Sequence, residues 1–298
     1  MGGKTFGPIG VLGLYTETAL HCGAESGLGY VDLPVQRERH TNFPVIPGSS
    51  IKGVLRDEMK GKPGDTGKLS DEEVKKFFGS EDAKTPGSVS FGDGIVAVFP
   101  IRSTGVPFHW VTCPFVLERV FRAMGTAWTE KGTPPRDKAW GKGNGELLLE
   151  EIHVVKDISK AALFNGGKGQ GLGLLLSLLP ASNEYQYTRD QFLDRLLVLN
   201  DEDFGELVDT GTDVVTRIKL NALGTTVNLK EGVHPEISRK ENREGNMFVE
   251  ELVPPESLFV CPLRAPADTA FDSQKLPVVI RLGGDETIGR GVTRVTFR

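Results

Sequence analysis

Aliphatic residues cluster at the two ends of the chain and predict strands there. Residues 9–15 (IGVLGLY) form a nearly continuous apolar run near the N-terminus. Near the C-terminus, residues 277–282 (PVVIRL) and 291–297 (GVTRVTF) flank the glycine-rich stretch GGDETIGRG, residues 283–291. Glycines allow the positive φ angles that tight turns need, so the pattern predicts a hairpin at this end.

A different spacing predicts a helix within the stretch PVIPGSSIKGVLR. Four apolar residues recur there at helical spacing: Ile51, Val54, Leu55 and Met59. Ser49 or Ser50 is expected to cap the first turn. Lys52 and Arg56 lie four residues apart and share another face of the helix.

Further helices and strands follow from local signals. Ser70, with Glu73 three residues later, has the spacing of a capping box and predicts a helix over residues 70–79. The other predictions are two strands around a Gly-Asp-Gly turn in residues 88–103, a helix in 113–125, a loop in 126–142, a strand in 146–155 and a helix in 187–199.

Residues 213–252 have β-rich ends and a polar, basic middle, which predicts a long hairpin or arm. Between Arg217 and Arg243 six Lys or Arg residues outnumber three Glu, for a net charge of +3. The whole pattern mixes short strands with a few helices, without a clean linker. It favours an α+β fold formed by one elaborated domain over residues 1–298.

Composition narrows the functional classes. The net charge of the 298-residue chain is −5, so any contact with nucleic acid must use local basic patches. Three widely separated cysteines indicate neither a disulfide framework nor a zinc site, and they fit a reducing cytoplasm. The N-terminus lacks the features of a signal peptide, and the apolar stretch at residues 172–180 is too short to cross a membrane.

The turn GGDETIGRG differs by one letter from the GGDEF signature of cyclic-dinucleotide synthases. That signature lies in the middle of its domain, whereas only seven residues follow Gly291 here. Asp285 and Glu286 have no obvious helper acids nearby in the sequence, which disfavours the cyclase interpretation. A phosphate cradle formed by backbone N–H groups, with Arg290 and Arg294 beside them, remains open.

Two other segments carry candidate chemistry. At the PGSSIKG helix start, free N–H groups, Ser49, Ser50 and Lys52 could bind an anion, although an ordinary capped helix explains the same spacing. The glycine-rich loop and the stretch after it hold the other candidates: His21, Glu25 and Asp32 for catalysis, and Arg37, Arg39 and His40 as a basic cluster. Each of these also has a plain explanation as a loop or turn residue.

Several sequence blocks together resemble the RAMP superfamily of CRISPR RNA-binding proteins. The blocks are VDLPVQRERHTNFPVIPGSSIKG, FPIRSTGVPFHWVTCPFVLERV, TRIKLN, NMFVEELVP and the C-terminal GGxxxxGRG turn. They are most similar to the Cmr branch, and within it to the repeating backbone subunit of the type III-B effector complex. The equivalent subunit of the type III-A complex is the nearest alternative.

The resemblance implies a ferredoxin-like (RRM-like) palm with a protruding β-hairpin thumb, for which residues 213–252 are the approximate position. It also implies a cytoplasmic filament of copies along a CRISPR guide RNA, with other Cmr subunits and no membrane. Complementary target RNA would be cut at regular intervals with Mg²⁺ or Mn²⁺. A non-cleaving guide-RNA scaffold and a metal-independent repeat-processing nuclease are the alternatives.

The resemblance also assigns roles to individual residues. Asp32 matches the aspartate needed for target cleavage, as metal ligand or general base, and His21 matches a histidine on the same loop. Either Glu250 or Glu251 matches an acid near the cut site, and Lys52 matches a lysine on the guide backbone. The guide-binding surface that these blocks predict consists of Arg37, Arg39, Ser49, Ser50, Lys52, Arg56, Gly284, Gly289 and Arg290.

Overall fold

The computed structural model describes residues 5–24, 30–61, 67–165, 171–220 and 246–298. The strands are β1 (Phe6–Thr16), β2 (Val45–Ile46), β3 (Ser90–Phe91), β4 (Gly94–Arg102), β5 (Phe108–Thr112), β6 (Lys138–Trp140), β7 (Glu146–Leu149), β8 (Ile152–Asp157), β9 (Leu196–Val198), β10 (Asp213–Lys219), β11 (Asn246–Leu252), β12 (Leu258–Pro266), β13 (Val279–Arg281) and β14 (Val292–Phe297). The α-helices are α1 (Gly48–Met59), α2 (Asp71–Phe78), α3 (Pro114–Ala123), α4 (Gly173–Leu176), α5 (Gln186–Arg195) and α6 (Asp201–Thr210).

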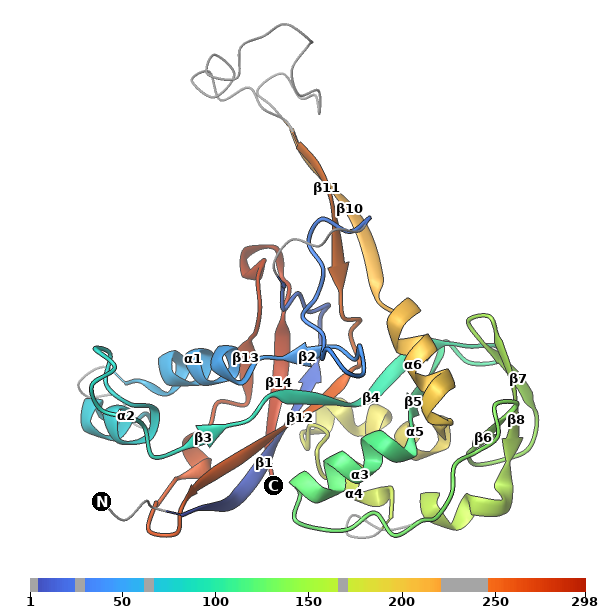
Figure 1. Cartoon of the computed structure of the whole chain (residues 1–298), viewed down its shortest axis with the longest axis horizontal. Helices are drawn as coiled ribbons and strands as arrows, with labels where there is room; N and C mark the ends of the chain where they lie inside the picture. Colours follow the sequence, from blue (N-terminus) through green and yellow to red (C-terminus); the bar gives the residue numbers. More distant parts are fainter. Residues whose placement is uncertain (1–4, 25–29, 62–66, 166–170, 221–245) are drawn as a thin grey trace, which may run out of the picture.

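One mixed sheet runs through the body of the molecule in the order β13-β14-β1-β12-β4-β5-β9-β6-β8-β7. The strands from the two ends of the chain pair near one edge of this sheet: β1 is antiparallel to both β12 and β14, and Leu12 lies opposite Phe297. Helices α1 and α2 lie beside one half of this sheet, and α3 to α6 gather around the other half (Figure 1). An α+β fold with a large sheet is therefore confirmed.

The hairpin of β10 and β11 is a separate two-stranded sheet that rises away from the body (Figure 1). We call it the arm. Its strands pair from Asp213 opposite Leu252 to Lys219 opposite Asn246, so the predicted hairpin is confirmed in its described part. The middle of the predicted arm, residues 221–245, lies outside the described residues.

Local signals predicted α2 correctly. The Ser70 hydroxyl accepts a hydrogen bond from the Glu73 N–H, and the Glu73 carboxylate accepts one from the Ser70 N–H at 2.8 Å. This is the reciprocal capping box expected from the spacing. The prediction for α1 was right in register but wrong at its start, because Ser49 and Ser50 lie inside the helix. The N-cap is Pro47, and no side chain caps the helix.

Three predictions failed where the pairing of strands decided the structure. Residues 146–155 form two strands rather than one, because Glu150 takes a positive φ and reverses the chain into the hairpin β7–β8. The predicted helix 187–199 ends at Arg195, since the aliphatic run Leu196–Val198 pairs parallel with β5 and is fully buried. The predicted loop 126–142 contains β6, which pairs with β8 and β9.

Within the described part of the chain, no helix combines the length and the apolar character that crossing a membrane requires.

Candidate active site

Three segments meet at the base of the arm. They are the His21 loop (residues 17–24), the Asp32 segment (residues 30–37) and the glycine turn (residues 283–291). Leu33 of the Asp32 segment forms an isolated parallel bridge with Glu250 of β11, so this segment lies along the edge of the arm. The corner thus assembles parts of the chain that are far apart in sequence.

Asp32 is exposed, and main-chain bonds fix its position. The N–H groups of Asp32 and Leu33 donate to the carbonyl oxygen of Val249 at 3.0 and 3.1 Å. In return the Val249 N–H donates to Asp32 Oδ2 at 2.8 Å. The other carboxylate oxygen makes no hydrogen bond within the described residues, so it is available to a proton or a cation.

His21 is largely buried beside the arm. Its Nδ1 lies 2.9 Å from the carbonyl oxygen of Glu251 and 3.8 Å from Glu250 Oε1. Because a carbonyl oxygen can only accept, Nδ1 carries the proton, and Nε2 is the ring nitrogen left for other partners. A Cβ atom at Gly23 would lie 2.7 Å from Nε2, so a side chain there would displace the imidazole.

The neighbouring glutamates of β11 point to opposite sides of the arm, as successive residues of a strand must. Glu251 accepts from the Val35 N–H at 2.9 Å, from the Thr212 hydroxyl at 2.8 Å and from Arg37 Nη2 at 2.6 Å. Burial acts to raise the pKa of Glu251, but these hydrogen bonds outweigh burial and hold the pKa below its usual value. Glu251 is therefore a satisfied, ionised partner of Arg37.

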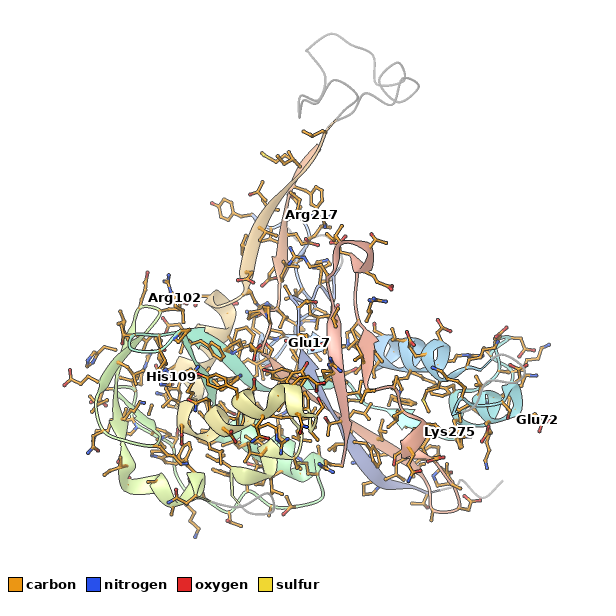
Figure 2. All side chains as sticks on the ribbon, turned by 180° about the vertical axis from the view of Figure 1, so that it is seen from behind. Glu17, Glu72, Arg102, His109, Arg217 and Lys275 are labelled. Carbon is orange, nitrogen blue, oxygen red and sulfur yellow. The ribbon has the colours of Figure 1, made fainter. Side chains whose placement is uncertain are left out.

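Glu250 faces His21 and has no exposed side-chain surface. Arg217, which Figure 2 labels on the arm, has its Nη1 atom 3.2 Å from Glu250 Oε2 and also forms an ion pair with Asp285. Burial, and then the hydrogen bond shared with Asp285, raises the pKa of Glu250, while His21 and Arg217 oppose the rise only in part. The same hydrogen bond lowers the pKa of Asp285, so the pKa values of the two acids shift in opposite directions.

The glycine turn packs on the His21 loop. The Gly284 N–H donates to the carbonyl oxygen of His21 at 2.8 Å, and the Gly291 N–H donates to that of Ala19 at 2.9 Å. A Cβ atom at Gly283, where φ is +80°, would lie 2.1 Å from the same His21 oxygen. These N–H groups are used inside the protein, which leaves fewer of them for a phosphate than the sequence suggested.

Asp285 corrects an interpretation of the turn. In the sequence it had no helper acids nearby, but in the fold Glu250 and Arg217 contact it. Sequence reasoning missed Asp285 and Arg217 as members of this corner. The sequence offered two weak signals. One is an Asp in a glycine turn, a residue type that suits the left-handed conformation it adopts there at φ +63°. The other is an arginine at an inward-facing position of β10.

The helix start lies apart from these contacts. The Gly48 N–H donates to Asp93 Oδ1 at 2.8 Å, so a carboxylate already uses part of the predicted anion site. Lys52 lines an open pocket of about 590 Å³ together with Arg264 and Phe6, and none of the described lining residues is acidic. Among the described residues, Lys52 thus has no ion-pair partner, and it lines a pocket whose charged lining residues are Lys52 and Arg264.

The other predicted RNA-binding cations differ in how free they are. Arg37 is only 14% exposed and is paired with Glu251, while Arg56 lies 3.7 Å from Glu81. Arg39 is exposed. Arg290 has a buried Nε atom without a hydrogen-bond partner among the described residues. Arg39 and Arg290 therefore stay candidates for RNA contact, whereas the placement of Arg37 favours a structural role.

The side chains at the arm base decide how a metal ion could be held there. Within the described residues, no group of three or more His, Cys, Asp or Glu side chains is placed to hold a metal ion. Glu250 and Glu251 are each paired with an arginine. Of these three acids, Asp32 has a carboxylate oxygen without a partner among the described residues, which fits a Mg²⁺ or Mn²⁺ ion held mainly by substrate oxygens rather than by a protein cage.

Residues 14–294 match the model of the RAMP superfamily. The chain belongs to the RAMP superfamily. This RAMP protein is 30% identical to the CRISPR system Cmr endoribonuclease Cmr4 of Pyrococcus furiosus, over 97% of this chain and 95% of that one. It is also 34% identical to the CRISPR system Cms endoribonuclease Csm3 of Streptococcus thermophilus, but over only 23% of this chain and 34% of that one.

Solved structures give the same result. The crystal structure of oligomeric Cmr4 from Pyrococcus furiosus superposes with a TM-score of 0.66 and 25% identity, covering 97% of this chain and 98% of that one. A cryo-EM structure of the type III-B Cmr-beta bound to cognate target RNA superposes with a TM-score of 0.68, 19% identity and coverage of 97% and 96%. The predicted RAMP membership and the similarity to the Cmr branch are confirmed.

Proposed function

We propose that this chain is the repeating backbone subunit of a type III-B CRISPR effector complex. It binds guide RNA and cleaves the complementary target RNA. One observation carries the proposal: a chain similar along 97% of its length to the Cmr4 endoribonuclease places Asp32, His21 and Glu250 together at the base of a protruding arm. The type III-A alternative has weaker support, because the similarity to Csm3 covers 23% of the chain.

In this proposal the large sheet is an elaborated ferredoxin-like palm and the arm is the thumb. Copies of the chain stack head to tail along the guide, beside other Cmr subunits, as the oligomeric crystal form of the similar Cmr4 suggests. The thumb of each copy splays the target RNA at regular intervals. This spacing brings one phosphodiester at a time to the exposed Asp32.

The guide-binding surface is narrower than the sequence suggested. Lys52 lines the acid-free pocket beside α1, and Arg39 is exposed. Ser49 and Gly289 are exposed as well, and Gly289 has open space around it. We assign guide contact to Arg39, Ser49, Ser50, Lys52, Gly289 and Arg290.

The cleavage is a transfer of the phosphoryl group within the target strand. The 2′-OH beside the scissile phosphate loses its proton to the free oxygen of Asp32, and the resulting oxyanion attacks phosphorus. The bond from phosphorus to the 5′ oxygen breaks, and that oxygen takes a proton from water. The products are a cyclic 2′,3′-phosphate and a 5′-OH end. The arm and Asp32 orient the target strand so that the 2′ oxygen lies in line with phosphorus and the leaving 5′ oxygen. Most of the rate enhancement must arise from this alignment.

A divalent cation, Mg²⁺ or Mn²⁺, is part of the proposal. RNA oxygens would hold it, with Asp32 as a further ligand in the alternative in which Asp32 is not the base, and it would supply charge stabilisation for the phosphate oxygens. Glu250 and Glu251 already pair with arginines, so we do not assign them as its ligands.

The test is a cleavage assay with the reconstituted complex on guide-matched RNA. The wild-type complex should give a ladder of regularly spaced products that EDTA abolishes. Asp32→Ala should remove the ladder and leave target binding intact, because Asp32 is exposed and alanine keeps the main-chain hydrogen bonds to Val249. A full-rate ladder from Asp32→Ala refutes the assignment, and the lack of a ladder from the wild-type complex favours a scaffold. Cutting of precursor RNA by the chain alone would instead indicate a processing nuclease.

A further inference from the structure

Asp285 does not point into solvent as an acid of a surface turn usually does. Its carboxylate forms an ion pair with Arg217, a residue of β10 in the arm (Figure 2). The same nitrogen of Arg217 lies 3.2 and 3.4 Å from the two oxygens of Glu250. The guanidinium also stacks against Phe248, 5.3 Å from the ring centre. Arg217 therefore bridges the glycine turn and the arm.

The turn holds Asp285 in a fixed direction. Its φ of +63° is a left-handed conformation, which Asp and Asn adopt more readily than most residues. The Asp285 carbonyl oxygen accepts from the Ile288 and Arg290 N–H groups at 3.1 and 3.3 Å. Glu286, the next residue, is a contrast: it is 61% exposed and pairs with Arg281, beside the turn and away from the arm.

The same turn also fixes the histidine. The Gly284 N–H donates to the His21 carbonyl oxygen, and Gly283 approaches that oxygen too closely for any side chain. The glycine turn thus makes two independent contacts, the first with the main chain of His21 and the second with Arg217. Glu250, which lies between these contacts, has its position set from both sides.

We propose that Asp285 is a positioning residue for RNA cleavage: by binding Arg217 it holds Glu250 beside His21 and fixes the base of the arm against the Asp32 segment. This inference rests on the proposed function. Asp285 touches neither the target phosphate nor Asp32, and it acts on the rate through the geometry of the arm. Loss of its charge would leave Arg217 with one carboxylate in place of two, and Glu250 would be drawn toward the guanidinium.

The test uses the assembled complex with Asp285→Asn and Asp285→Gly, because both residues tolerate the left-handed conformation and avoid the strain that alanine would add. Glu286→Gln is the matched control, since it removes the same charge from the same turn. Single-turnover cleavage and target-RNA affinity are measured for each, together with amide hydrogen exchange of residues 214–217 and 248–251.

We expect both Asp285 variants to cut about tenfold more slowly, which is the effect of losing about one charge-assisted hydrogen bond. Their affinity for target RNA should be unchanged, and amide exchange at the arm base should be faster. Glu286→Gln should match the wild type in all three measurements. In the double variant Asp285→Asn with Glu250→Gln, cleavage should be no slower than with Glu250→Gln alone, because Asp285 acts through Glu250.

Other outcomes overturn the inference in distinguishable ways. A weaker target affinity that accounts for the slower cutting would make Asp285 an RNA-binding residue. If the losses in cleavage rate of the two single variants multiplied in full in the double variant, Asp285 would act independently of Glu250. Wild-type rates and exchange in Asp285→Asn refute the inference alone, whereas a wild-type complex that does not cut refutes the proposed function and, with it, the role of Asp285 in cleavage.

Discussion

The two faces of the arm base carry the same type of side chain in opposite states. On one face Glu251 accepts from Arg37, Thr212 and Val35, and these hydrogen bonds lower its pKa. On the other face, one residue earlier, burial raises the pKa of Glu250, which lies next to His21 and pairs with Arg217. The first face is a closed structural joint, and the second carries residues that we propose for cleavage.

The difference shows how a strand can separate stability from chemistry. Alternation along β11 sends successive residues to opposite sides, so each glutamate meets its own set of partners. A fully satisfied buried ion pair fixes geometry but cannot exchange protons or partners at low cost. Substitutions on the Glu251 face should therefore change the stability of the fold, and substitutions on the Glu250 face should change the rate of cleavage.

The largest expected effect is on the closed face. Glu251→Ala should lower the free energy of unfolding by about 3 kcal/mol, because Arg37 and the Val35 N–H lose their acceptor while remaining buried. Urea unfolding of the full chain, followed by circular dichroism, measures this change.

Glu250→Gln is the control for that experiment. Burial disfavours the charged form of Glu250 and raises its pKa, so the neutral glutamine should change stability by less than about 1 kcal/mol. If Glu250→Gln were as destabilising as Glu251→Ala, the two faces would not differ as described.

The next effect is the pH dependence of stability, which should have opposite signs on the two faces. The lowered pKa of Glu251 stabilises the fold above the unfolded-state pKa, and this stability is lost as the pH falls through the folded-state pKa. The deficit of Glu251→Gln relative to the wild type should thus shrink toward acid pH.

For Glu250 the sign reverses. Its raised pKa stabilises the fold below the unfolded-state pKa, and that contribution is lost as the pH rises through the folded-state pKa. Glu250→Gln should therefore gain on the wild type as the pH rises above the usual range of glutamate. Urea unfolding at a series of pH values checks both signs, and parallel curves for the two variants would contradict the pKa directions.

The sequence predicted local features of this corner but not its contacts. The Ser70 capping box was found because its partners lie three residues apart. Glu250 and Glu251 could not be told apart, since the register of β11 against β10 decides which face each occupies. Asp285 was set aside because its partner Arg217 is 68 residues away in the chain, and only the fold brings the two together.

The resemblance supplied what spacing could not. Asp32, His21 and Lys52 were candidates from their own segments, and the resemblance assigned their roles; the fold places the first two at the arm base and the third at a separate pocket. The prediction of serine caps for α1 was wrong, because Pro47 is the N-cap residue and Asp93 accepts a hydrogen bond from the first N–H group of the helix. A hydrogen bond to a residue distant in the chain thus replaced the predicted local cap.

The smallest expected effect extends the comparison from acids to cations. Lys52 is free at the rim of the acid-free pocket, whereas Arg37 is bound to Glu251. Lys52→Ala should leave urea unfolding unchanged but weaken guide-RNA binding and reduce the slope of log affinity against log salt by about one counterion. Arg37→Ala should lower stability and leave the slope unchanged. Nitrocellulose filter binding over a range of salt concentrations measures both slopes, and an unchanged slope for Lys52→Ala would return Lys52 to the role of an ordinary surface residue of α1.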